Sequence, residues 1–320
     1  MITNTIPSSL EAPKVSVIIV NYRTPKLLLE AIRSVMNTVR NRFEIIAVDN
    51  ASGDNTATLV REQFPLVHMI QSSVNVGFAA GNNLAMPFAR GEYIFFLNPD
   101  TIVHEGSIDT LIAYLDSHLK VGLVSPKLLN ADGSLQRSIN RFYSFFGTLF
   151  DNRIASQFLK TDAFEDHDTI REIDWAKGAA LMIRHSILKE IGSFDEQFWI
   201  YAEEIDLCYR IKKAGWANVY LPSAVITHLE KQSSKQHRAE MFIQNYKSFY
   251  LFLRKHYSTL DFTLYRLRSI IGIFFWLTIY WIQSLRGNDS ARKSLDTYRT
   301  LFQWHLNLSQ NLSQKTLAPR

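Results

Sequence analysis

The chain has 320 residues, of which 47% are hydrophobic, so it can build a sizeable buried core. Lysine and arginine exceed aspartate and glutamate by 35 − 30 = 5, a mild excess that excludes a dedicated nucleic-acid binder and suits phosphorylated ligands or an anionic membrane surface. The single cysteine, Cys208, has no partner for an intramolecular disulfide, which fits a reducing compartment.

The chain opens with a polar stretch that lacks the basic start and apolar run of a signal peptide. We therefore expect a flexible tail over residues 1–13, and we expect the part of the chain that follows it to lie in the cytoplasm. Residues 15–20 form a nearly unbroken apolar run that ends at Asn21, which predicts a strand buried on both faces. Residues 25–39 carry apolar side chains at helical spacing and predict a helix.

The same alternation continues along the chain. Residues 43–48 predict a second buried strand that ends at Asp49 and Asn50, and a helix follows over residues 56–63. Residues 67–71 and 93–97 predict two more strands. The order β-α-β-α-β-α-β indicates an α/β fold, a doubly wound, Rossmann-like, mostly parallel sheet flanked by helices. Such sheets bind ligands where the strands end.

The second half of the predicted domain, which we place at residues 14–255, is less regular. A helix over 107–117 and a strand over 121–126 precede an irregular stretch, 130–172, that has the length of a binding or lid segment. A strand region over 175–184 and helices over 185–191 and 203–214 follow. Short strands over 219–221 and 225–227 lead to His228.

Residues 256–320 form a C-terminal segment of different character. Residues 269–285 contain no charge and five large aromatic residues, with arginines on both sides. The run is slightly short for a spanning helix, which needs about 20 apolar residues. Aromatic residues with basic flanks favour a helix that lies on an anionic membrane through residues 266–286. Packing on the domain or on a partner chain in a homodimer, and true spanning, remain alternatives.

Asp100 follows the fourth predicted strand, after Asn98 and Pro99. A carboxylate in this place can bind a hard divalent ion that also takes diphosphate oxygens, because Mg²⁺ typically uses one or two protein carboxylates together with phosphates and water. Capping of the next helix is the alternative role for Asp100.

An acidic cluster, Glu203, Glu204 and Asp206, opens the helix predicted over residues 203–214. First-turn carboxylates stabilise a helix through its dipole, which is one interpretation. The other is catalytic: aromatic residues just before the cluster can raise the pKa of a carboxylate into the range of a general base.

His228, at the end of the last predicted strand, is either a structural hydrogen-bonding residue or a metal ligand, and its place beside a diphosphate site favours the ligand. Asp49 and Asn50 either cap a turn or bind a base or ribose. Residues 75–83 resemble a phosphate-binding loop only loosely, since Gly77 and Gly81 do not have Walker or dinucleotide spacing.

Together these segments resemble the family-2 glycosyltransferases of the GT-A fold, in particular the rhamnosyltransferase-like branch. The resemblance covers about residues 14–255 and rests on segments 15–22, 48–54, 75–83, 98–100 and 201–210, followed by His228. It implies a nucleotide-sugar site formed by Asn21, Asp49, Asn50, Asn75, Gly77, Gly81, Asn82 and Asn98.

The resemblance also implies a mechanism. Mg²⁺ or Mn²⁺ at Asp100, with His228, neutralises the departing nucleotide diphosphate. A base among Glu204, Glu203 and Asp206 deprotonates the acceptor hydroxyl in a single inverting displacement. The acceptor side is implied to include Trp175, Gly178 and Ala179.

Two residues depart from the family pattern. Asn98 replaces the first aspartate of the metal motif, a variant that recurs in the rhamnosyltransferase-like branch and bears on metal affinity. Glu204 takes the place of an aspartate, with one extra methylene, so Glu203 remains a rival for the base.

The branch implies dTDP-L-rhamnose as the donor and a saccharide or polyprenyl-diphosphate-linked acceptor, in surface polysaccharide synthesis at the inner face of the cytoplasmic membrane. A UDP- or GDP-sugar donor and a non-catalytic nucleotide-sugar-binding protein are the alternatives. A nucleotidyltransferase usually needs a glycine-rich basic loop after its first strand, which residues 21–25 lack. A glycosidase needs paired carboxylates but no diphosphate site.

Overall fold

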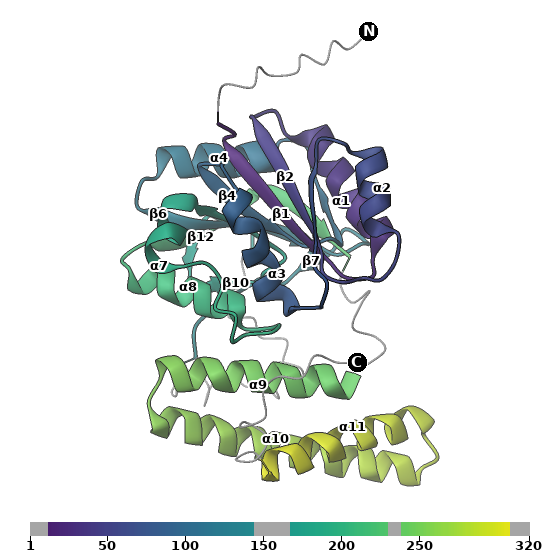
Figure 1. Ribbon diagram of the computed structural model, residues 1–320. Coiled ribbons are helices and arrows are strands. Elements are labelled where there is room, and N and C mark those ends of the chain that lie inside the picture. Colours follow the sequence, from purple (N-terminus) through teal and green to yellow (C-terminus); the bar gives the residue numbers. More distant parts are fainter. Residues whose placement is uncertain (1–11, 144–166, 230–237, 308–320) are drawn as a thin grey trace. The chain divides into compact units, whose positions relative to one another are not determined.

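The computed structural model describes residues 12–143, 167–229 and 238–307 (Figure 1). The chain divides into an α/β unit (Met1–Phe142, Asp166–Gln197 and Glu203–Ser233) and a helical unit (Tyr143–Glu165, Phe198–Ala202 and Ser234–Arg320). Residues 238–255 fall in the helical unit, while the sequence predicts a first domain over 14–255. Residues 1–11 of the expected tail and 144–166 of the expected lid lie outside the described residues.

The first half of the α/β unit has the alternation that the sequence predicts. Its elements are β1 (Val15–Asn21), α1 (Pro25–Thr38), β2 (Phe43–Asp49), α2 (Thr56–Gln63), β3 (His68–Gln71), α3 (Gly77–Ala85), η1 (Met86–Phe88), β4 (Tyr93–Leu97), β5 (Thr101–Val103) and α4 (Ser107–Ser117). The second half consists of β6 (Val121–Leu129), β7 (Leu135–Gln136), β8 (Ile139–Asn140), β9 (Arg171–Ile173), β10 (Trp175–Ala176), β11 (Ala180–Arg184), α7 (His185–Ile191), α8 (Glu203–Lys213) and β12 (Ala217–His228).

The main sheet of the α/β unit has the strand order β3-β2-β1-β4-β11-β6-β12-β5. Strands β1 to β4 run parallel, as a doubly wound sheet requires. β11 runs antiparallel to both β4 and β6, and β5 antiparallel to β12, so the sheet is mixed. This is the Rossmann-type arrangement of a GT-A fold. Because two reversals at β11 cancel, β4, β6 and β12 point the same way.

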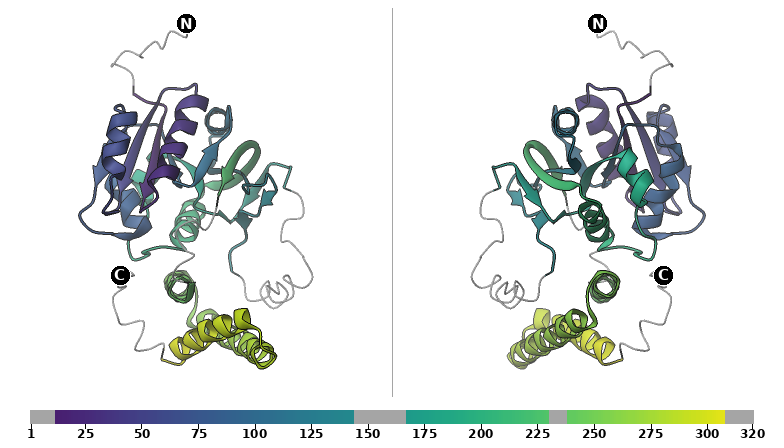
Figure 2. Two further views of the ribbon diagram at one scale, coloured as in Figure 1. Left: turned by 90° about the vertical axis from the view of Figure 1, so that its right-hand side faces the viewer. Right: turned by 90° about the vertical axis from the view of Figure 1, so that its left-hand side faces the viewer.

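Alternate residues of the central strands face opposite sides of the sheet, as strand geometry dictates. Val17 and Ile19 of β1 belong to a hydrophobic core shared with α1, α2 and α4, while α3 lies against β1 and β2. The close approach of α3 depends on Gly81, because a Cβ atom there would lie 2.9 Å from Cγ1 of Val20. Helices therefore cover both faces of the twisted sheet (Figures 1 and 2).

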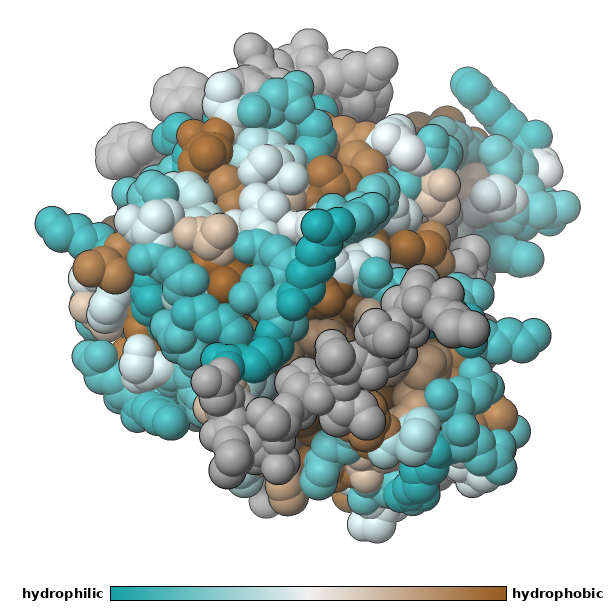
Figure 3. All heavy atoms as spheres, turned by 90° about the horizontal axis from the view of Figure 1, so that it is seen from above, coloured by the Kyte–Doolittle hydropathy of each residue, from teal (hydrophilic) through white to brown (hydrophobic). Residues whose placement is uncertain are grey.

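The polar residues of interest follow the carboxyl ends of the parallel strands. Asn21 ends β1 and is the register partner of Asp49, which ends β2. Asn98 follows β4, and His228 ends β12. These four residues therefore lie along one edge of the sheet. The view from above, toward the end where β1 and β2 begin, shows a largely polar surface with separated apolar patches (Figure 3).

The helical unit contains α9 (Arg238–His256), α10 (Thr259–Leu285) and α11 (Asp289–Leu306). Ser258 caps α10 by accepting a hydrogen bond from the backbone N–H of Asp261 at 3.1 Å, while Asp261 accepts one from the N–H of Ser258. Tyr250 of α9 is fully buried and its ring contacts those of Phe262 and Trp304, which joins the three helices.

α10 is the one helix of the described chain that is long and apolar enough to cross a membrane by length and composition. Only 6% of its most apolar stretch of 18 residues is buried, and Ile273 is the one buried residue of the helix. Several large apolar residues are exposed instead, at a spacing that places them along one face of the helix. They are Leu260, Leu267, Ile271, Phe274, Phe275, Trp281, Ile282 and Leu285.

Candidate active site

The loops after β1 and β2 are tied together by the side chains at the strand ends. Asn21 is fully buried, and its amide nitrogen donates at 3.4 Å to the hydroxyls of Ser52 and Thr56. Asp49 accepts a hydrogen bond from the backbone N–H of Ser52 at 3.0 Å through Oδ1. Asn21 and Asp49 thus fix the conformation of the loop after β2, at the edge of the sheet where the sequence predicts that the nucleotide binds.

Asn50 organises the loop that enters α3. Its amide nitrogen donates to Oδ1 of Asn75 and to the carbonyl of Gly77, and its own oxygen accepts from the N–H of Val76, each at 3.0 Å. Asn82 donates to the carbonyl of Phe78 within α3. Asn50, Asn75 and Gly77, three of the residues predicted to bind the nucleotide-sugar, therefore form one hydrogen-bonded network at the entry to α3.

A second set of contacts brings the acceptor segment to the acidic helix. The backbone N–H of Asn98 donates to the carbonyl of Ala179 at 2.9 Å. A Cβ atom on Gly178 would lie 3.4 Å from Cβ of Glu204, so Glu204 stands directly beside this segment. The side-chain oxygen of Asn98 is buried and has no hydrogen-bond partner among the described residues, which leaves an acceptor for a ligand. Asn98, Gly178, Ala179 and Glu204 thus meet in one place.

Glu203 and Glu204 differ in environment although they are adjacent at the start of α8. Glu203 is only 5% exposed, whereas Glu204 is partly exposed, although Oε2 of each residue is buried and accepts no hydrogen bond in the described structure. Burial, followed by the charge of Glu204, holds the pKa of Glu203 well above its usual range. Burial therefore favours the neutral form of Glu203.

Asp206, the third candidate acid, is engaged elsewhere. It is fully buried, and Oδ2 pairs with Nε of Arg210 at 2.7 Å, one turn further along α8. Arg210 in turn donates to the carbonyls of Ile191, Gly192 and Ser193. This arrangement fits a structural role in which Asp206 orients the arginine that anchors the chain after α7.

Asp100 and His228 form the candidate metal pair. Nε2 of His228 lies 3.3 Å from Oδ1 of Asp100, and their side chains are 9% and 15% exposed. The pairing of β12 with β5 sets their positions, together with a hydrogen bond from the N–H of Leu229 to the carbonyl of Asp100. No group of three or more acidic, histidine or cysteine residues that fits a metal occurs among the described residues. A carboxylate, an imidazole and diphosphate oxygens still suit Mg²⁺ or Mn²⁺.

Sequence reasoning missed two residues behind this pair. Gln136 of β7 is buried and contacts Nδ1 of His228, and Asn130 contacts Gln136 in turn. β7 has two residues, too few to show a strand period, and it falls in the stretch that we expected to be irregular. No signal in the sequence marks either side chain.

Trp175 lies in β10 and is half-buried, with Nε1 donating to the carbonyl of Arg141 at 3.0 Å. The bond fixes the indole at the edge of the two-stranded sheet formed with β8. In this position Trp175 keeps part of its ring surface available for stacking on a sugar.

Strained backbone gathers near the candidate residues. The described non-glycine residues with positive φ are Arg23, Ala51, Tyr201 and Ala202. The first two follow β1 and β2 at their carboxyl ends, and the other two come directly before Glu203. Left-handed backbone at non-glycine residues costs energy and often marks functional sites.

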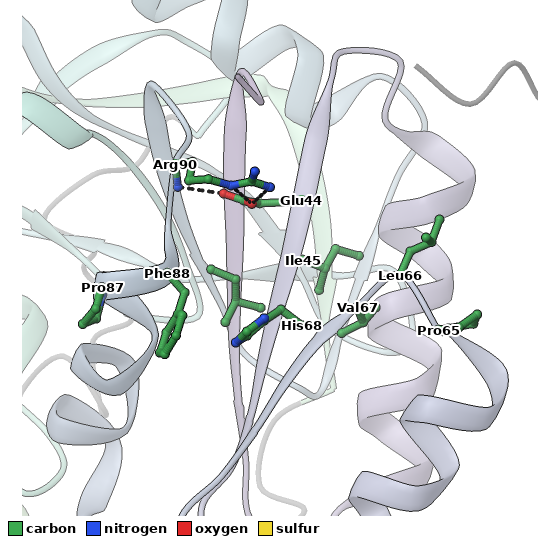
Figure 4. Close-up of a pocket in the computed structure, with 10 residues that line it drawn as sticks. Glu44, Ile45, Pro65, Leu66, Val67, His68, Pro87, Phe88 and Arg90 are labelled. Atoms are coloured by element: carbon green, nitrogen blue, oxygen red, sulfur yellow. Dashed lines mark hydrogen bonds and ion pairs between the residues drawn. The ribbon is translucent and has the colours of Figure 1, made fainter. Parts of the chain in front are cut away.

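A cavity of about 580 Å³ lies away from these residues, near the amino ends of β2 and β3 (Figure 4). Arg90 closes one side by donating from Nε and Nη2 to Oε2 of Glu44, at 3.0 and 2.7 Å. His68 and Phe88 line it with their rings 4.7 Å apart. None of the predicted site residues lines this cavity, so size alone does not identify the active site.

Comparison with known proteins decides the family. The sequence model described as Glycosyl transferase family 2 matches residues 16–191, more than half of the chain. The chain belongs to this family. It is therefore a transferase enzyme, and the matched region includes the ends of β1, β2 and β4, Asp100 and Gly178.

The curated relatives of this family-2 enzyme include two rhamnosyltransferases. One is the N-acetylglucosaminyl-diphospho-decaprenol L-rhamnosyltransferase of Mycobacterium tuberculosis, to which the chain is 26% identical. The aligned region covers 76% of this chain and 84% of that protein. Another is the rhamnosyltransferase WbbL of Escherichia coli, to which the chain is 25% identical. The aligned region covers 56% of this chain and 70% of WbbL.

A solved structure supports the fold of this family-2 enzyme. It is the mannosyltransferase PcManGT from Pyrobaculum calidifontis, in complex with GDP-Man and Mn²⁺. The TM-score is 0.57 at 18% identity, with 96% of this chain and 89% of that chain covered. At this identity the likeness shows the GT-A fold alone.

Proposed function

We propose that this family-2 enzyme transfers L-rhamnose from dTDP-L-rhamnose, with inversion, to a hydroxyl of a saccharide or polyprenyl-diphosphate-linked saccharide. The observation that carries the proposal is the meeting of Glu204, Gly178, Ala179 and Asn98, which joins a carboxylate, the acceptor segment and the strand that leads to Asp100. The relatives that are named as rhamnosyltransferases support the sugar, and the decaprenol-linked substrate in one name supports the acceptor.

Glu204 is the base in this proposal. As the acceptor oxygen forms its bond to the anomeric carbon, the bond from that carbon to the diphosphate oxygen breaks and Glu204 takes the hydroxyl proton. Burial keeps the neighbouring Glu203 neutral by raising its pKa, so Glu203 does not compete for the proton. Asp206 remains with Arg210 and supports the start of α8.

Asp100 and His228 would hold Mg²⁺ or Mn²⁺, which neutralises charge on the departing nucleotide diphosphate when bound. The buried, unpartnered oxygen of Asn98 and the short distance between the two ligands fit such an ion. The donor side consists of Asn21, Asp49, Asn50, Asn75, Gly77, Gly81, Asn82 and Asn98. Trp175 contributes a ring face on the acceptor side.

We further propose that the helical unit associates with the inner face of the cytoplasmic membrane. The exposed apolar face of α10 supports this proposal, together with Arg266 and Arg268 before the charge-free run 269–285 and Arg286 after it. Membrane association would help an enzyme with a lipid-linked acceptor, because it concentrates the enzyme and the acceptor at one surface. A homodimer through the same face is the alternative.

The test is calorimetric titration of the full chain with dTDP-L-rhamnose, UDP-glucose, UDP-N-acetylglucosamine and GDP-mannose, each with and without Mn²⁺ or Mg²⁺. Metal-dependent binding of dTDP-L-rhamnose, followed by transfer to a lipid-diphosphate-linked N-acetylglucosamine, is the expected result. Asp100→Asn should lose the metal dependence. Binding of a UDP- or GDP-sugar instead would keep the enzyme class and change the donor.

A further inference from the structure

Two linked side-chain amides, of buried Gln136 and partly exposed Asn130, hold His228 on the side away from Asp100. Nδ1 of His228 lies 2.7 Å from Oε1 of Gln136. Nε2 of Gln136 donates to Oδ1 of Asn130 at 3.0 Å and to the carbonyl of His228 itself at 3.1 Å. Gln136 and His228 are 4% and 7% exposed, so water does not replace these bonds readily.

Backbone carbonyls fix the donor and the acceptor of each hydrogen bond that links Asn130, Gln136 and His228. A carbonyl only accepts, so the group of Gln136 that faces the His228 carbonyl must be its NH₂. Asn130 likewise directs its NH₂ toward the carbonyl of Leu135, at 3.3 Å, and its oxygen toward Gln136. The oxygen of Gln136 is therefore the atom that faces His228, and Nδ1 of His228 must donate to it.

This direction decides what the other side of the ring presents. When Nδ1 of a neutral imidazole carries the hydrogen, Nε2 has only a lone pair. In this neutral form the lone pair faces Oδ1 of Asp100 at 3.3 Å, so that two acceptors point toward one another. A cation that binds both atoms satisfies them. Metal-binding histidines commonly donate their second nitrogen to such a partner.

We infer that Gln136 is a positioning residue that holds His228 in the Nδ1–H tautomer and so directs Nε2, together with Asp100, toward a divalent cation. This inference rests on the metal site of the proposed function. It adds a residue to the site that contacts neither the cation nor the substrate.

The local fold explains how a residue 92 positions away reaches His228. β6 and β7 form a hairpin in which Leu128 pairs with Gln136. The turn is closed by hydrogen bonds from the N–H of Asn130 to the carbonyl of Ser134 and from the N–H of Gly133 to the carbonyl of Asn130. Gly133 has a φ of +80°, which glycine adopts without strain. β6 also pairs with β12, the strand that ends at His228.

The experiment measures Mn²⁺ affinity of the full chain by electron paramagnetic resonance of the free ion, in the presence of dTDP. Gln136→Met removes both polar groups at similar volume, and we expect it to weaken Mn²⁺ binding by about 10- to 100-fold. Gln136→Glu keeps an acceptor toward Nδ1, and we expect it to bind Mn²⁺ at least several-fold more tightly than Gln136→Met. Leu135→Ala, a change of the preceding, 37% exposed residue in β7, is the matched control and should bind as the wild type does.

A second readout is the tautomer itself. Nitrogen-15 spectra of the imidazole rings, assigned with His228→Gln, should show the Nδ1–H form of His228 in the wild type and its loss in Gln136→Met. Wild-type Mn²⁺ affinity in a folded Gln136→Met protein would overturn the inference while leaving the metal site intact. If the wild type and Asp100→Asn both fail to bind Mn²⁺, the metal site of the proposed function falls, and the role of Gln136 falls with it.

Discussion

Glu203 and Glu204 show how neighbouring residues of one type acquire different chemistry. They are consecutive at the start of α8, yet Glu203 is buried and Glu204 is partly exposed beside Gly178. Burial penalises the charged form of a carboxylate, and a second charge nearby adds to the penalty. Burial therefore favours the protonated form of Glu203, while Glu204 lies at the partly exposed position beside Gly178.

The first prediction concerns the base. Glu204→Gln should lower transfer by roughly 10²- to 10⁴-fold, the usual contribution of a general base, while donor affinity stays near the wild-type value. Glu203→Gln should lower transfer far less, because glutamine resembles the neutral acid. Initial rates and donor titrations on both variants check this. Equal losses in the two variants would contradict the assignment of Glu204.

The second prediction concerns stability. The pKa of Glu203 is raised in the folded state, so the folded state binds more protons than the unfolded state above the usual value of 4.5. Stability should therefore fall as pH rises from 4.5 toward the folded pKa, by at most about 1.4 kcal/mol per pH unit for one proton. Urea unfolding of Glu203→Gln should lack this fall, whereas Glu62→Gln, at an exposed position, should retain it.

At the scale of elements, long apolar runs were enough to predict β1, β2, β4 and the helices between them. Each run is buried on both faces, so the pattern is strong. Strands of two or three residues, such as β5 and β7, show no period and were not predicted. The antiparallel direction of β11 was also missed, because strand direction depends on the path of the chain between strands.

The same limit applies to the candidate site. Residues at the ends of strong strands, such as Asp49 and Asp100, could be selected from the sequence because sheet topology brings strand ends together. Gln136 could not, since it reaches His228 through a short hairpin and a contact across 92 positions. The engagement of Asp206 by Arg210 has a helical spacing of four residues, but that spacing alone did not distinguish it from a catalytic acid.

The third prediction belongs to the packing of α3 on β1. Gly81→Val would place a branched side chain where even a Cβ atom lies 2.9 Å from Cγ1 of Val20, which is fixed in a central strand. We expect a loss of about 2 kcal/mol from overpacking. Ala80→Val adds the same branched residue to the half-buried neighbouring position of the same helix and is the control. Equal melting temperatures of the two variants would show that α3 can move away from β1.

At the scale of the whole molecule, the chain combines an α/β unit that carries all the candidate site residues with a helical unit that carries none of them. The charge-free run at residues 269–285 marked part of one helix, but α10 begins at Thr259, where Ser258 and Asp261 cap it. The aromatic contacts of Tyr250 with Phe262 and Trp304 give this unit its own core. The exposed apolar face of α10 is therefore not covered by the other described helices of its unit.

The last prediction tests what covers that face. Ile271 and Phe274 are 60% and 58% exposed, and burying two such side chains in lipid contributes about 2–3 kcal/mol. The full chain should sediment with vesicles that contain phosphatidylglycerol, and Ile271→Asn with Phe274→Asn should weaken this binding roughly 30-fold or more. Leu66→Asn with Leu119→Asn changes residues of the α/β unit that are 84% and 74% exposed, and it should bind as the wild type does. The opposite outcome has two parts: all three proteins bind vesicles equally, and light scattering shows a dimer that only Ile271→Asn with Phe274→Asn disrupts. That outcome would show that a second copy of the chain covers this face.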